Sequence, residues 1–140
     1  MPQLPPLRDD EVVYIAIRNP NFMNAATGNI APNAFYMRER DLEGQPPHGL
    51  STTVLDHCPS IEDIKKITGL KSNVCGVDIL DVGAVRAAGL EVVRVNETKA
   101  LIVGMPYPAN EEDYETAEKR NILANALAAI SNRGVRRFGI

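Results

Sequence analysis

The chain has 140 residues, of which 44% are hydrophobic and 24% are charged, with ten glycines, ten prolines, two cysteines and no tryptophan. A collagen-like or low-complexity chain carries far more Gly and Pro, and a disulfide scaffold needs more cysteines, so both classes are excluded. An intrinsically disordered chain would carry less apolar material and a larger net charge. The composition therefore indicates a globular domain near the usual size for one hydrophobic core.

The charge balance narrows the expected partners. Fifteen basic and eighteen acidic residues give a net charge of −3. Nucleic-acid binding generally needs a broad basic surface, so we do not expect nucleic acid as a partner. The longest apolar runs, 12–17 and 100–103, are far shorter than the roughly 20 residues of a membrane-spanning helix. The first seven residues lack the apolar segment of a secretory signal, so we expect a cytoplasmic location and reduced thiols.

The first half of the chain alternates short apolar runs with long polar segments. Residues 1–9 hold three prolines within six residues, which predicts an extended, solvated tail. Runs rich in β-branched, aromatic or threonine residues predict three strands. These strands are expected at 12–17, 34–37 and 50–55. The segments 19–33 and 38–49 are predicted polar loops, and loops of this length often carry function.

The second half predicts more regular structure. Ser60 is the expected N-cap of a helix that ends at Gly69. Asp81 is expected to cap a short helix that Gly89 terminates. Three more strands are expected at 73–80, 90–95 and 100–105. The clearest element is a helix over 111–131, since its first turns are acidic and its body is dense in strong helix formers.

The long C-terminal helix sets the expected architecture. Leu123, Leu127 and Ile130 line one face of it and are expected to pack on the sheet. The short helix after Asp81 has too few residues for an ordinary parallel crossover, which favours antiparallel pairing. We therefore expect an α+β fold: a single compact domain over 10–132 with a mixed, mostly antiparallel sheet of about six strands. Residues 133–140 are expected to form a basic tail.

The densest cluster of reactive groups is Asp56-His57-Cys58, between a predicted strand end and a predicted helix start. A helix N-terminus favours the thiolate form of a nearby cysteine. With His57 or His48 as the base, Cys58 would suit a thiol-dependent hydrolase or transferase. The structural interpretation is that Cys58 is a small buried hydrophobe and His57 a polar turn residue. Two His and two Cys match no standard zinc spacing, so no metal site is predicted.

A second constellation joins Arg18, after the first predicted strand, to Gly49-Leu50-Ser51-Thr52-Thr53. An arginine beside a Ser/Thr-rich strand resembles the pattern of ADP-ribosyltransferase toxins. That resemblance implies NAD as a cofactor, held by Arg18 and Ser51. The family's later E-x-E or Q-x-E signature has no counterpart here, and Glu97 stands in a predicted turn, so the catalytic step is unassigned. The structural interpretation is that Thr52 and Thr53 are ordinary strand residues, present because threonine has a high β propensity.

No convergent catalytic set and no phosphate-binding glycine motif is present in the sequence. We therefore predict a small binding or accessory domain that uses loops 19–33 and 38–49 for recognition. Its candidate binding residues are Asn19, Asn33, Arg38 and Arg40. The expected partner is another protein or a second copy of the chain. The alternative is a small enzyme, of either the thiol-dependent or the NAD-using kind, and the sequence names no cofactor beyond that alternative.

Overall fold

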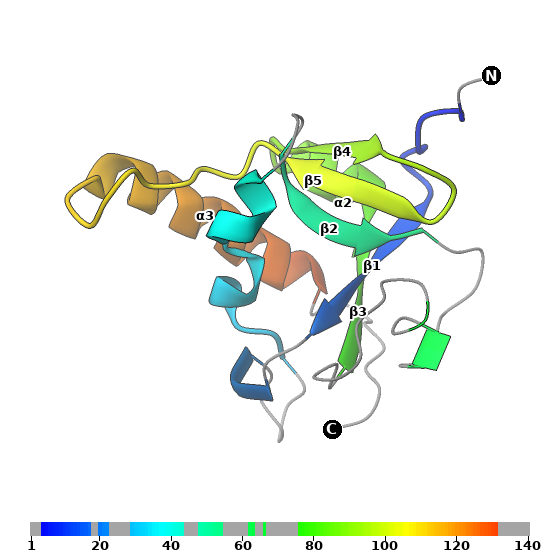
Figure 1. Ribbon diagram of the computed structural model, residues 1–140, viewed down its shortest axis with the longest axis horizontal. Helices are drawn as coiled ribbons and strands as arrows, with labels where there is room; N and C mark the ends of the chain where they lie inside the picture. Colours follow the sequence, from blue (N-terminus) through cyan, green and yellow to red (C-terminus); the bar gives the residue numbers. More distant parts are fainter. Residues whose placement is uncertain are drawn as a thin grey trace.

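The computed structural model describes residues 4–17, 20–22, 29–43, 48–54, 62–63, 66 and 76–131. Five strands in this part of the chain form one antiparallel sheet in the order β3-β1-β2-β5-β4 (Figure 1). They are β1 (Val12–Ile17), β2 (Leu50–Thr53), β3 (Gly76–Asp81), β4 (Glu91–Arg94) and β5 (Lys99–Val103). The α-helices with both ends in the described residues are α2 (Val82–Ala87) and α3 (Tyr114–Ser131). The predicted α+β class and antiparallel sheet are confirmed, with five strands described rather than about six.

The strand expected at 34–37 is wrong. Residues Pro32–Phe35 form a 3₁₀ turn, η2, instead. Pro32 favours this start because its ring fixes φ, and Ala31 before it is extended at φ −73° and ψ 143°. Phe35 is fully buried, so burial of its ring in the core outweighs the β propensity of this apolar run. The predicted helix from Ser60 to Gly69 lies mostly outside the described residues.

The core lies on one face of the sheet. Val13, Ile15 and Ile17 of β1 point to this face, where α3, α2 and η2 cover it. Leu127 of α3 is fully buried, and Leu123 and Ile130 pack partly buried against the same core. The predicted apolar face of the C-terminal helix is therefore confirmed. None of the helices in the described ranges is long and apolar enough to cross a membrane.

The start of α3 differs from the sequence-based expectation. The helix begins at Tyr114 because Asp113 caps it, its Oδ1 accepting a hydrogen bond from the Thr116 amide at 3.3 Å. Asp113 Oδ2 also accepts from the Ala109 amide at 3.1 Å. The hydrogen bond from Ala109 is the largest cause lowering the pKa of Asp113 below its ordinary value. Figure 1 shows the first half of α3 extending away from the sheet.

Part of the N-terminal segment contacts α2, although residues 4–6 and 8–10 are exposed. Leu7 is only 2% exposed and belongs to the core. The amide of Gly83 donates to the Asp9 carbonyl at 3.1 Å, and the amide of Val82 donates to the Glu11 carbonyl at 3.0 Å. These hydrogen bonds satisfy two backbone amides in the first turn of α2. Asp81 occupies the N-cap position but makes no side-chain capping bond.

Arg86 of α2 holds the N-terminal segment and the edge strand β4 together. Its guanidinium donates to the Leu7 carbonyl at 2.7 Å, to Asp9 Oδ1 at 2.9 Å and to Glu91 Oε1 at 2.6 Å. It also donates to the Val92 carbonyl at 3.2 Å, while the Val92 amide donates to Glu91 Oε1 at 2.8 Å. Both outward backbone groups of Val92 are thus satisfied, which protects this sheet edge from pairing with another chain.

Candidate functional site

The described ends of the first predicted recognition loop, 19–33, lie together beside α3. The amide of Ala31 donates to the Phe22 carbonyl at 2.8 Å, which joins the short 3₁₀ turn η1 (Pro20–Phe22) to the start of η2. Ile30 is 3% exposed and Phe22 packs partly buried against the core. This loop is therefore anchored at both ends by apolar burial.

The second predicted loop, 38–49, begins with a closed turn. The Asp41 carboxylate accepts from the Arg38 amide at 2.8 Å, and the Asp41 amide donates to the Arg38 carbonyl at 2.9 Å. This pair leads into the 3₁₀ turn η3 (Glu39–Leu42). The Arg38 guanidinium lies 5.5 Å from the centroid of the Phe22 ring, so a cation–π contact connects the two loops.

The segment between η2 and η3 is fastened to α3 through Tyr36. Its hydroxyl donates to Asn121 Oδ1 at 2.6 Å. The Arg120 guanidinium lies 4.0 Å from the centroid of the Tyr36 ring, and Arg120 Nε donates to the same Asn121 oxygen at 3.3 Å. Helix α3 therefore fixes the position of the chain that runs between the two loops.

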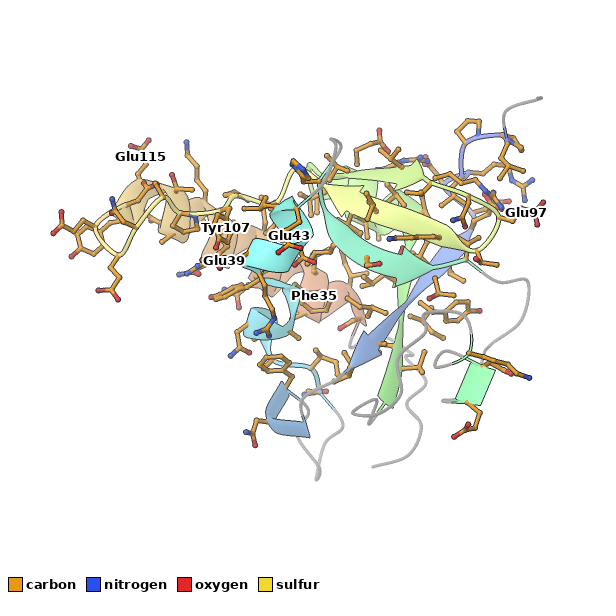
Figure 2. All side chains as sticks on the ribbon, in the orientation of Figure 1. Phe35, Glu39, Glu43, Glu97, Tyr107 and Glu115 are labelled. Carbon is orange, nitrogen blue, oxygen red and sulfur yellow. The ribbon has the colours of Figure 1, made fainter. Side chains whose placement is uncertain are left out.

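These contacts define what we call the Arg–aromatic surface: Phe22, Tyr36, Arg38 and Arg120. Asn33 is exposed on η2 nearby in the chain, and the backbone of Arg40 lies in η3. Figure 2 shows the side chains of Glu39 and Glu43 over the region between α3 and the sheet, where the buried Phe35 also lies. Of the predicted binding positions, Arg38 belongs to this surface, Asn33 and the backbone of Arg40 lie on the turns η2 and η3, and Asn19 lies outside the described residues.

The predicted catalytic residues are only partly described. Arg18, His57 and Cys58 lie outside the described residues. His48 is half-buried just before β2, and Ser51 is exposed on the sheet face opposite the core, where it pairs with Leu101.

The remaining hydroxyl groups of β2 are buried. The Thr52 hydroxyl donates to the Ala100 carbonyl at 2.9 Å, and Thr53 is 4% exposed. Ser51 is therefore the β2 hydroxyl that solvent reaches. Glu97 lies in the exposed turn between β4 and β5, as expected. In the described part of the chain, no group of three or more His, Cys, Asp or Glu residues is placed to hold a metal ion.

Sequence reasoning missed the partnership between α3 and the loops. Tyr36 was expected in a strand, and no role was predicted for Arg120 or Asn121. The available signal was Arg120, the last charged residue of the helix, directly before the uncharged stretch 121–131 that begins with Asn121. Asp78 was also missed: it is fully buried on the core face of β3 opposite Ile15, and its Oδ1 accepts from the Ile79 amide at 3.3 Å.

Comparison of the chain with protein-family models, with curated proteins and with solved structures found no match.

Proposed function

We propose that this protein is a small recognition module of the cytoplasm, and that its two long loops bind a protein partner. The observation that carries the proposal is the joint anchoring of the loops. The cation–π contact between Arg38 and Phe22 connects one loop to the other. The hydrogen bond from Tyr36 to Asn121 connects the chain between the loops to α3. Loops held on a rigid frame are the usual place for binding residues.

The composition of this surface supports recognition over a purely structural role. Aromatic and arginine side chains dominate the binding energy of protein interfaces. Here Tyr36 and Arg120 are braced by a hydrogen bond and a ring contact, so binding would cost little side-chain entropy. The exposed Asn33 and Glu43 supply polar groups around them.

The test is capture by cross-linking in lysate of cells that express the chain. The double variant Asn33→Arg, Glu43→Arg changes two exposed loop positions and leaves the core intact. The control is Glu97→Arg, which reverses one charge at the exposed turn between β4 and β5. We expect the loop variant to lose the proteins that wild type captures while the control keeps them. Equal capture by both variants would refute the proposal, and capture of the chain itself would identify the partner as a second copy.

The second candidate is the NAD-using transferase, which the exposure of Ser51 favours, since a residue that holds NAD must be reachable. The thiol-dependent alternative predicts fast alkylation of Cys58 near neutral pH. Reaction of Cys58 only after denaturation would eliminate that alternative.

A further inference from the structure

The outward face of α3 leaves two large apolar side chains in solvent. Tyr114 is 75% exposed and Ile122 is 63% exposed, the two highest values among the large hydrophobic residues that the structure describes. Glu118 lies between them, and the exposed Asn125 and Ala129 continue the stripe, since residues three or four apart share one side of a helix. An exposed stripe of this kind is suited to contact with another chain.

This stripe is separate from the Arg–aromatic surface. Arg120 lies over the Tyr36 ring, on the side of α3 that faces the loops. Ile122 follows Arg120 by two residues, which turns it about 200° around the helix axis. The first half of α3 also extends away from the sheet, as Figure 1 shows, so a partner has access along the outward face.

Charge is distributed unevenly along this helix. The segment 111–118 holds five acidic residues and no basic one, whereas 121–131 holds no charged residue. Figure 2 shows Glu115 at the end of α3 that lies far from the sheet. Within the described ranges, the acidic segment forms one ion pair, between Glu115 and Lys119 at 3.6 Å. Three arginines follow the helix in the sequence at 133–137, outside the described residues.

We propose that the outward faces of α3 from two copies of the chain pack together as an antiparallel pair, with Ile122 on the twofold axis. In such a symmetric contact the residue on the axis meets its own copy, here apolar against apolar. Ser131 and Asp113 are equally far from Ile122 along the chain, so each helix ends beside the acidic start of its partner. Two residues of chain span at most about 7 Å, so Arg133 stays near those carboxylates.

The charges select a second copy in this orientation. A parallel pair would place Glu115 and Glu118 against their own copies, and like charges in contact oppose association. The antiparallel pair places each glutamate opposite the uncharged stretch 121–131 of the partner. The arginines of the same chain reach the acidic segment less well, because Ser131 lies about 24 Å from Glu115 along the helix.

The first test is sedimentation equilibrium of the full chain from about 10 µM to about 1 mM, because one helix pair is a small interface and predicts weak association. The apparent mass should rise from that of one chain toward that of two. Ile122→Glu should weaken association about tenfold or more, since it places two carboxylates together on the axis. The matched control is Val95→Glu, which adds the same charge at a 50% exposed apolar residue after β4.

Cross-linking tests the register of the pair. In Ile122→Cys, the two new thiols meet at the axis and should form an intermolecular disulfide under mild oxidation. The control is Tyr114→Cys, at a more exposed position, whose two copies would lie about 24 Å apart along the helices. Mass spectrometry of the linked peptides separates these bonds from any made by Cys58 or Cys75. Equally fast cross-linking of the two variants would rule out the axis at Ile122.

Charge exchange tests the ends of the pair. Glu111→Arg and Arg133→Glu should each weaken association, and the two changes combined in one chain should restore most of it. No restoration would exclude the contact between these ends. A wild-type chain that stays monomeric up to about 1 mM, or an equal loss in Val95→Glu, would overturn the pairing of α3.

The variant of the recognition loops, Asn33→Arg with Glu43→Arg, should associate as wild type does. If that variant loses association while Ile122→Glu keeps it, the loops form the contact between copies and the pairing of α3 is wrong. If wild type stays monomeric while the loop variant still loses its captured protein, the pairing is wrong and the recognition function stands. If the chain pairs through α3 while the loop variant captures what wild type captures, only the recognition function is wrong.

Discussion

Replacement of Arg86 tests how the N-terminal segment and the edge strand are held. In Arg86→Met, the carbonyls of Leu7 and Val92, both part-buried, lose their donor. An unsatisfied group of this kind costs about 1–3 kcal/mol. The ion pairs to Asp9 and Glu91 add little, because those side chains are 75% and 58% exposed. We expect a total loss of about 2–4 kcal/mol from the free energy of unfolding.

The measurement is urea unfolding, with calorimetry to follow the melting temperature, which should fall by roughly 8–15 °C. Arg8→Met is the control, since its pair with Asp10 lies on the surface with both side chains more than 70% exposed, and no measurable loss is expected. A loss below about 1 kcal/mol in Arg86→Met would refute the assignment of Arg86 as the connection between these elements.

The ion pair between Arg86 and Glu91 predicts that the stability of the protein depends on pH. The hydrogen bond from Arg86 is the largest cause lowering the pKa of Glu91 below its ordinary value of 4.5. A carboxyl whose folded pKa is lowered contributes stability above its unfolded pKa, and that contribution is lost as pH falls through the folded pKa. Wild type should therefore lose stability below about pH 4.5 more steeply than Arg86→Met does. Parallel acid-unfolding curves for the two proteins would contradict this reasoning.

Three further predictions follow from the described contacts. Asp113→Ala removes the N-terminal cap of α3, so hydrogen exchange of the Thr116 amide should accelerate while that of the Leu127 amide stays unchanged. Equal protection of the Thr116 amide in wild type and variant would show that the cap is unimportant. Gly83→Ala should destabilise the protein despite the better helix propensity of alanine, because the new Cβ would lie 2.8 Å from the Asp9 carbonyl oxygen. In the Arg86→Met background, where the N-terminal segment is held less firmly, Gly83→Ala should cost less free energy of unfolding. An equal cost in both backgrounds of a double-mutant cycle would argue against coupling between positions 83 and 86. Millimolar NAD should raise the melting temperature of wild type more than that of Ser51→Ala if the transferase alternative is correct, and no shift in either protein removes that alternative.

The sequence by itself determined the elements whose pattern is local and repeated. The β-branched run at 12–17 forms β1, and the apolar run at 100–103 forms most of β5. The spacing of Leu123, Leu127 and Ile130 defines the packed face of α3. Such periodicity depends only on neighbours in the chain, so it can be recognised without the fold.

Tertiary contacts decided the structure of the segments that lack such a periodic pattern. Residues 34–37 have strand-forming side chains, yet Phe35 is buried in a turn under α3, because core burial outweighs a weak local preference. Leu7 lies in the core, and its carbonyl accepts a hydrogen bond from Arg86, 79 positions later. The Arg–aromatic surface likewise depends on the pairing of Tyr36 with Asn121, 85 positions apart. Partners so distant in sequence leave no periodic signal, and only the folded chain brings them together.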